Sequence, residues 1–312
     1  MSIAEQPKTA IETFRDGNRE HRFIFVGGSA RSGTTLIQKM LCAHSKVCGG
    51  PEFDHAVQAM RLFQHMTSEL QLERQKFYYS ESEVTNSFRE FYASLFDQLA
   101  DRNPGIAYIS EKTPANIAAA PQLLKLFPDA FYVNVVRDGR DVVLSHQKVL
   151  KRFKEQHGRK GSKWWNEYSV RDVSRKWNND IGTYQQLLAD PAVADRVLNV
   201  RYEDVVENPA NVLTPMFEKL ELTLEDQVLE PESVDKEQLG YTVNVDGVWY
   251  TDGMFQQRLN NLSVSGWRQN LPWHKRLLAN FMQCRNLQLM GYPVSKSIIQ
   301  LRNIADRLRN RS

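Results

Sequence analysis

One glycine-bearing loop, within residues 22–45, constrains the fold of this chain more than any other feature. Residues 23–26 (Phe-Ile-Phe-Val) are aromatic or β-branched, which predicts a short buried strand. Beyond the loop, apolar residues recur at helical spacing from Leu36 to Leu41. A strand, a glycine loop and a helix in this order predict an anion site. The backbone N–H groups of the loop and of the first helical turn would form it.

The loop sequence runs from Gly28 to Thr35 and fits the G-x-x-x-x-G spacing of phosphate-binding loops. Thr34 follows the second glycine, where nucleotide triphosphatases have the lysine that reaches the β- and γ-phosphates. The loop is therefore predicted to hold a phosphate without hydrolysing ATP or GTP. A ligand-free glycine turn is the alternative, and four side chains that can donate to anionic oxygens argue against it: Arg31, Ser32, Thr34 and Thr35.

The stretch resembles the sulfotransferase superfamily, which uses 3′-phosphoadenosine 5′-phosphosulfate (PAPS), and it is most similar to the tyrosylprotein sulfotransferases. The resemblance implies that this loop binds the 5′-phosphosulfate end of PAPS through Arg31, Ser32, Gly33, Thr34 and Thr35. PAPS has no γ-phosphate, so the missing lysine agrees with the resemblance.

Strand patterns that alternate with helical patterns predict the fold class. We expect an α/β fold with a P-loop-like central parallel sheet flanked by helices, and the resemblance implies the sulfotransferase fold. Further strands are predicted at 106–110, 131–136 and 197–202, and helices within 55–75, 82–101, 114–128, 142–149, 170–190, 209–220 and 272–289.

The remaining segments define the expected organisation. Residues 1–21 are predicted to be a flexible leader, 22–292 the sulfotransferase domain, and 293–312 a basic helix or tail. The segment 47–52 is rich in turn-forming residues, and 222–262 is predicted to be loops.

Composition excludes several classes of protein. With 312 residues, 41% of them hydrophobic and 25% charged, the chain can build one large core. A net charge of only +3 argues against a nucleic-acid partner. The three cysteines form no disulfide framework, and neither they nor the histidines and acids show metal-ligand spacing, so no metal is expected. No run approaches the roughly 20 apolar residues of a membrane helix and no signal-peptide core is seen, so we expect a cytoplasmic protein without a membrane segment.

A second donor motif follows the strand 131–136. Arg137 ends this strand, and Ser145 lies eight residues further on, inside the next predicted helix. This resembles the 3′-phosphate motif of the family, so we assign Arg137 and Ser145 to the donor rather than to a surface turn. The tyrosylprotein enzymes have an arginine four residues after the serine, where this chain has Val149. Tyr202, at the end of the strand 197–202, matches a family position next to the donor.

Glu52 is the predicted general base. It follows the first helix in a turn of glycine and proline, where a carboxylate can lie at the mouth of a cleft. The tyrosylprotein sulfotransferases have a catalytic glutamate in the corresponding place. Because cytosolic sulfotransferases use histidine, His55 and His44 remain alternatives, and Glu111 is a further one.

Lys112 and Arg31 are predicted to stabilise the charge that develops during transfer. Lys112 follows the strand 106–110 and resembles the family lysine that contacts the leaving oxygen. A compact ammonium charge suits a sulfuryl group that passes between two oxygens. A surface lysine at a helix start is the alternative.

The acceptor is less defined. Residues 151–165 contain six Lys or Arg and one Glu, together with Trp164 and Trp165. They predict either a lid that binds an acidic peptide or anionic glycan, or a solvated charged loop. Trp267 resembles the family's late tryptophan segment, which closes over the donor, and Arg268 beside it is a candidate for the 3′-phosphate.

These observations predict a PAPS-dependent sulfotransferase that acts on a tyrosyl or phenolic hydroxyl by in-line displacement and releases 3′-phosphoadenosine 5′-phosphate. A carbohydrate or other small-molecule hydroxyl is the alternative acceptor. A non-catalytic nucleotide-binding protein is the alternative of another class, and a P-loop kinase is disfavoured by Thr34. A homodimer is left open.

Overall fold

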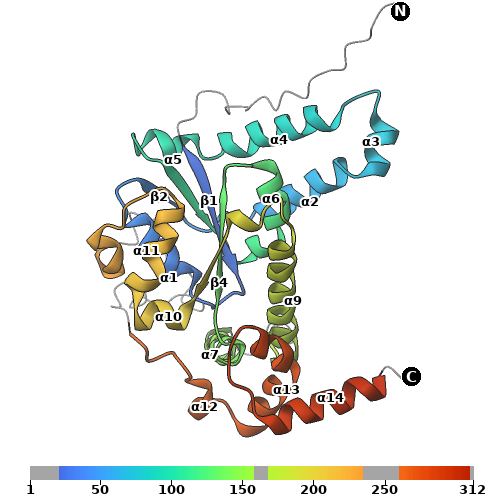
Figure 1. Cartoon of the computed structure of the whole chain (residues 1–312), viewed down its shortest axis with the longest axis vertical. Helices are drawn as coiled ribbons and strands as arrows, with labels where there is room; N and C mark the ends of the chain where they lie inside the picture. The colour runs from blue at the N-terminus through green and yellow to red at the C-terminus, as the bar shows by residue number, and fades with distance from the viewer. Residues whose placement is uncertain (1–20, 158–167, 235–259, 310–312) are drawn as a thin grey trace, which may run out of the picture.

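Parallel strands form a central sheet in the order β2-β3-β1-β4-β5 (Figure 1). The computed structural model describes residues 21–157, 168–234 and 260–309. The strands are β1 (Arg22–Gly28), β2 (Val47–Gly49), β3 (Tyr108–Lys112), β4 (Phe131–Val136) and β5 (Val197–Arg201). All four neighbouring pairs are parallel, so the carboxyl ends of the strands meet at one edge of the sheet.

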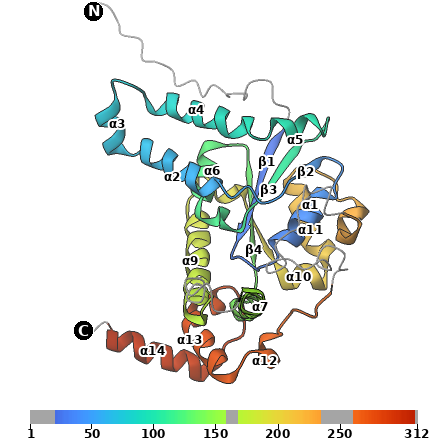
Figure 2. The same cartoon turned by 180° about the vertical axis from the view of Figure 1, so that it is seen from behind.

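Helices cover both faces of the sheet (Figures 1 and 2). One face carries α1 (Thr34–Cys42), α10 (Tyr202–Glu207) and α11 (Pro209–Lys219). The other carries α2 (Ala56–Met66), α4 (Glu81–Ser94), α6 (Ala120–Leu126) and α9 (Val170–Ala189). Short helices connect these elements: α3 (Glu69–Gln75), α5 (Asp97–Asp101) and the 3₁₀ turns Pro114–Ala118, Ala194–Arg196, Asp226–Leu229 and Pro231–Ser233.

The side chains of the central strand β1 are buried under helices on both faces of the sheet. Phe23 and Phe25 stack on each other, with ring centroids 5.4 Å apart, and belong to the core beneath α2, α4, α6 and α9. Ile24 and Val26 belong to the core beneath α1 and α11. Successive side chains of a strand point to opposite faces, so a strand that is buried on both faces must be apolar throughout.

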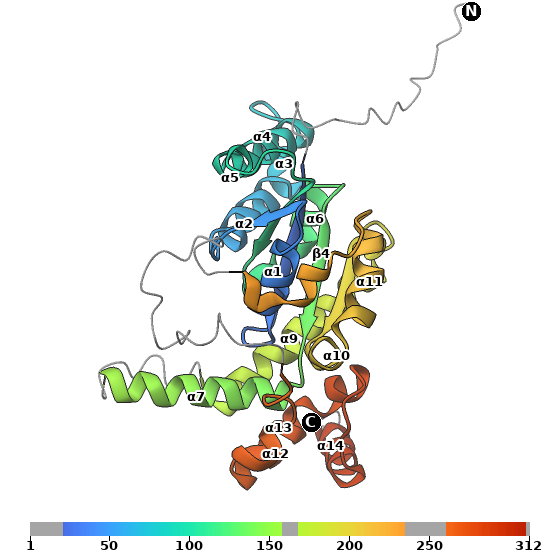
Figure 3. The same cartoon turned by 90° about the vertical axis from the view of Figure 1, so that its left-hand side faces the viewer.

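A group of helices lies at the carboxyl end of the sheet. It consists of α7 (Gly139–His157), α12 (Trp267–Asn270), α13 (Trp273–Leu289) and α14 (Lys296–Arg309). α7 begins directly after β4 and its far half projects from the body, as Figure 3 shows. α14 is held on α13 by Asp306, whose Oδ2 lies 2.6 Å from an Arg285 nitrogen.

The predicted fold class is confirmed, although two details of the sheet differ. The strand expected at 106–110 is Tyr108–Lys112, so Lys112 is the last residue of β3 and not a residue after it. Residues 47–52 were expected to be rich in turns, but Val47–Gly49 form β2, which pairs with β3 at the edge of the sheet. A three-residue edge strand is too short to show a period in the sequence.

The helices also differ in detail from the expectation. The segments 55–75 and 82–101 each contain two helices, not one. Thr113 directly precedes the 3₁₀ turn Pro114–Ala118, but its side chain makes no cap hydrogen bond there and donates to Glu111 instead. The first half of the predicted lid, up to residue 157, continues α7, whereas Trp164 and Trp165 lie outside the described residues.

Candidate active site

The predicted phosphate-binding loop joins β1 to α1, and its backbone requires glycine. Gly33 has φ of 101°, and a Cβ placed there would lie 2.4 Å from Cδ2 of Tyr202. Arg31 has φ of 74°, a left-handed conformation that non-glycine residues rarely adopt. The loop therefore curls tightly against the Tyr202 ring at the start of α10.

The residues predicted to hold the donor lie together around this loop. Arg31 Nε donates to Ser145 Oγ at 3.1 Å, which joins the loop to α7. Arg137 donates to the backbone oxygen of Arg31 at 3.2 Å, and its guanidinium carbon lies 4.5 Å from the ring centroid of Tyr202. The structure thus brings together three motifs that are far apart in the sequence.

Two buried donors in this cluster have no hydrogen-bond partner among the described residues. They are Ser32 Oγ and Arg137 Nε. Buried polar groups in native proteins are usually satisfied, so exceptions often mark a ligand site. A hydroxyl and a guanidinium nitrogen beside a glycine loop are suited to an anionic phosphate or sulfate group.

Glu52 and Lys112 form an ion pair next to the same loop. Lys112 Nζ lies 2.6 Å from Glu52 Oε1 and 3.4 Å from Oγ1 of Thr35. The Lys112 side chain is fully buried, while that of Glu52 is 26% exposed. A buried ammonium requires a nearby carboxylate, and the partial exposure of Glu52 leaves it within reach of a solvent-borne acceptor.

The alternative bases lie elsewhere. His44 is buried against Phe217, and its Nε2 lies 2.9 Å from the backbone oxygen of Thr223. His55 is exposed and immediately precedes α2. Glu111 is buried on the opposite face of β3 from Lys112, and burial raises the pKa of its carboxyl. Of these candidates, Glu52 is the one that forms an ion pair with Lys112, whose Nζ lies 3.4 Å from Thr35 in the loop.

Several residues that shape the site were not singled out in the sequence. Ser263 hydroxyl lies 2.7 Å from the Tyr202 hydroxyl, and its backbone oxygen accepts from Arg137 at 2.6 Å. Asp141 accepts from the backbone N–H groups of Ser265 and Trp267, both at 2.8 Å. Burial raises the pKa of Asp141 to about 6, against the opposing charge of Arg137.

Asp141 and Ser263 lie in motifs that the sequence does display, the Arg137–Asp141 turn and the serine-rich segment before Trp267. Spacing alone did not reveal that the two motifs bind each other. Asp180 on α9 gave no sequence signal, yet its Oδ2 accepts from Ser29 Oγ in the loop at 2.6 Å.

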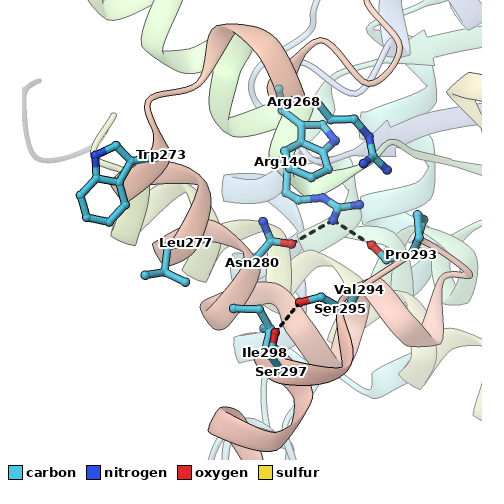
Figure 4. A pocket seen from close by; sticks show the side chains of 11 residues that line it. Arg140, Arg268, Trp273, Leu277, Asn280, Pro293, Val294, Ser295, Ser297 and Ile298 are labelled. Atoms are coloured by element: carbon cyan, nitrogen blue, oxygen red, sulfur yellow. Dashed lines mark hydrogen bonds between the residues drawn. The ribbon is translucent and has the colours of Figure 1, made fainter.

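Trp267 and Arg268 line a groove of about 630 Å³ between α12, α13 and the start of α14 (Figure 4). The Arg268 guanidinium packs on the Trp267 ring at 4.9 Å, and that of Arg140 at 4.0 Å. None of the predicted catalytic or donor residues lines this groove. Val149, at the position where the family has arginine, is buried against Tyr168.

Metal-binding clusters and membrane-spanning helices are both absent from the part of the chain that the structure describes. No group of three or more His, Cys, Asp or Glu side chains there could hold a metal ion. None of the described helices is both long and apolar enough to cross a membrane.

Comparisons with known proteins agree on one family. A family model described as "Sulfotransferase family" matches residues 24–226. Protein-tyrosine sulfotransferase 1 of Danio rerio is 30% identical over 223 residues, which cover 70% of this chain and 58% of that protein. Protein-tyrosine sulfotransferase A of Caenorhabditis elegans is 28% identical over 269 residues, 85% of this chain and 66% of that protein. The chain thus matches less than two thirds of either relative.

Solved structures agree on the fold. The sulfotransferase domain from the curacin biosynthetic pathway gives a TM-score of 0.58 at 19% identity, over 89% of this chain and 100% of that domain. The sulfotransferase domain from the Synechococcus PCC 7002 olefin synthase gives a TM-score of 0.55 at 19% identity, over 90% of this chain and 99% of that domain.

Proposed function

Because the chain belongs to the sulfotransferase family, we propose that it transfers a sulfuryl group from PAPS to an acceptor hydroxyl. A tyrosyl or phenolic hydroxyl is the first acceptor, since the relatives described above are protein-tyrosine sulfotransferases. The observation that carries the proposal is the Glu52–Lys112 pair beside the phosphate-binding loop, with Lys112 Nζ 3.4 Å from Thr35.

The donor would lie across the cluster around Arg31. The loop from Arg31 to Thr35 would hold the 5′-phosphosulfate end, and Arg137 and Ser145 the 3′-phosphate, with Tyr202 alongside. The bond from Arg31 to Ser145 and the unpartnered Arg137 Nε support this arrangement. PAPS, when bound, supplies the sulfuryl group and a phosphate leaving group.

Glu52 would take the proton of the acceptor hydroxyl as the acceptor oxygen bonds to sulfur and the bond from sulfur to the phosphate oxygen breaks. Lys112 and Arg31 would stabilise the negative charge on the sulfuryl and leaving oxygens. Fixed cations in a site shielded from water stabilise such charge far better than the same cations in water. The complete burial of Lys112 supports this role.

The exposed cations on the outer half of α7 support an anionic acceptor. Lys148, Lys151 and Lys154 all lie on the surface of this projecting helix. These ammonium groups would attract a tyrosine peptide with acidic flanking residues, and they would also attract an anionic glycan. A carbohydrate hydroxyl is therefore the second candidate acceptor.

Calorimetric binding of 3′-phosphoadenosine 5′-phosphate, with ATP as control, tests the donor. We expect micromolar binding of the former and none of the latter. The acceptor is then tested by incubating the protein with PAPS and a tyrosine peptide flanked by acidic residues, with the phenylalanine peptide as control. A preference for ATP would favour a kinase, and donor binding without transfer to peptides or glycans would favour a non-catalytic binding protein. Either result would overturn the proposal.

A further inference from the structure

Glu111 is a buried carboxylate that the proposed reaction does not use as a base. It precedes Lys112 on β3, and its side chain points to the opposite face of the sheet, where it is 2% exposed. Its Oε1 accepts from the Thr113 hydroxyl at 2.7 Å and its Oε2 from the Asn116 amide at 2.5 Å. Burial of a carboxylate costs free energy unless its oxygens are hydrogen-bonded, and both oxygens of Glu111 accept hydrogen bonds.

The Thr113 hydroxyl connects this carboxylate to the turn that contains Glu52. The backbone N–H of Phe53 donates to Thr113 Oγ1 at 3.1 Å. A threonine hydroxyl can donate one hydrogen bond, and here it donates that bond to Glu111. The lone pairs of the threonine oxygen are thereby directed to Phe53, the residue directly after Glu52.

The turn is one that needs external support. Asp54 has φ of 43°, in the left-handed region that is unfavourable for residues other than glycine. The Phe53 ring is anchored in the core, with its centroid 5.1 Å from that of Phe96. The N–H of Phe53 is the second anchor: it donates to the Thr113 hydroxyl at 3.1 Å and also interacts with the Glu111 carboxylate.

The other bonds of the network lead to the strand that carries the phosphate-binding loop. Asn116 also donates to the backbone oxygen of Val26 at 3.2 Å, and the N–H of Thr113 donates to the same oxygen at 3.2 Å. Val26 lies two residues before Gly28 on β1. Through these bonds, Glu111 fixes the Glu52 turn relative to the loop.

We propose that Glu111 is a positioning residue: by orienting the Thr113 hydroxyl toward Phe53, it holds the turn that presents Glu52 to Lys112 and to the acceptor. This rests on the proposed role of Glu52 as base. A misplacement of about 1 Å in a reacting group can cost on the order of 100-fold in rate. Loss of the network should therefore lower turnover and leave donor binding intact.

The matched variants Thr113→Val and Thr113→Ser test the proposal, because valine keeps the shape of threonine and serine keeps its hydroxyl. We expect Thr113→Val to lower kcat about 10- to 100-fold with 3′-phosphoadenosine 5′-phosphate affinity unchanged within about 2-fold, and Thr113→Ser to restore most of the turnover. Glu111→Gln should act in the same direction as Thr113→Val. The Thr113 pair decides the question even where Glu111→Gln does not fold.

Hydrogen–deuterium exchange of the peptide that spans residues 50–54 gives a readout that does not depend on activity. Exchange should accelerate in Thr113→Val and not in Thr113→Ser. Unchanged exchange in Thr113→Val, or equal losses of turnover and donor binding, would overturn the positioning role. A wild-type protein without transfer activity would instead overturn the proposed function, while the exchange result would still report on the network.

Discussion

Arg31 and Ser145 are joined by a 3.1 Å hydrogen bond that links the phosphate-binding loop to α7. Both side chains also belong to the proposed donor site. Replacement of the serine should therefore weaken the binding of the donor without changing the fold. We expect Ser145→Ala to lower the affinity for 3′-phosphoadenosine 5′-phosphate about 10-fold, as one hydrogen bond to a charged group would. Calorimetry measures this, with the exposed Ser87→Ala on α4 as control. Equal affinities for the two variants would remove Ser145 from the site.

Lys112 should contribute to chemistry more than to donor affinity. Lys112→Met removes a fixed charge next to Thr35, and we expect kcat to fall about 100- to 1,000-fold with donor affinity changed far less. Lys112→Arg keeps the charge but not the compact ammonium, so it should recover only part of the rate. Steady-state kinetics with the donor varied separates the two effects. A Lys112→Met enzyme with normal kcat would contradict the assigned role.

Gly33 should tolerate no side chain. Gly33→Ala places a Cβ 2.4 Å from the Tyr202 ring at a φ of 101°, so we expect the free energy of unfolding to fall by about 1–3 kcal/mol and donor binding to weaken. Gly182→Ala on α9 is the matched control, because nothing lies within 4 Å of its Cβ, and alanine should stabilise the helix by about 0.5–1 kcal/mol. Denaturant unfolding measures both. Similar changes in the free energy of unfolding for the two substitutions would show that the loop has room for a side chain at position 33.

Because of the titration of Asp180, the free energy of unfolding should fall as pH rises. Burial raises its pKa from 3.8 to about 6, against the opposing bond from Ser29. A carboxyl with a raised folded-state pKa contributes stability that is present below pH 3.8 and is lost as pH rises through about 6. The loss amounts to at most about 3 kcal/mol.

The difference in unfolding free energy between the wild type and Asp180→Asn, measured from pH 3.5 to 7.5, isolates this contribution. We expect the wild type to lose stability relative to Asp180→Asn across roughly pH 4–6. Ser29→Ala removes the bond that lowers this pKa, so it should extend the loss to higher pH. A difference that does not vary with pH would mean that Asp180 titrates normally.

The sequence predicted the parts of the fold and site that depend on local pattern. The loop from Gly28 to Thr35 and the strand before it follow from spacing and residue type, and the pair Arg137 and Ser145 follows from the resemblance to the family's 3′-phosphate motif. The structure places them together. The sequence did not predict that Glu52 pairs with Lys112, because each residue was assigned separately and their contact depends on the order of the strands.

Other features left too little local signal. β2 is three residues long, and its partner is β3, far along the chain. Asp180 looks like any polar residue of an amphipathic helix until its contact with Ser29 is seen. Glu111 was considered as a base because it precedes Lys112, but the alternation of side chains along a strand sends adjacent residues to opposite faces. The predicted leader, the cytoplasmic location and the homodimer stay predictions.

Glu52→Gln removes the proposed base and keeps the shape of its side chain. Single-turnover transfer from PAPS to an acidic tyrosine peptide would be measured for the wild type and for Glu52→Gln, with donor affinity determined in parallel. We expect transfer by the wild type and a loss of about 100- to 10,000-fold in the variant, with donor affinity nearly unchanged. Transfer by Glu52→Gln at the wild-type rate would contradict the role of Glu52 as the base.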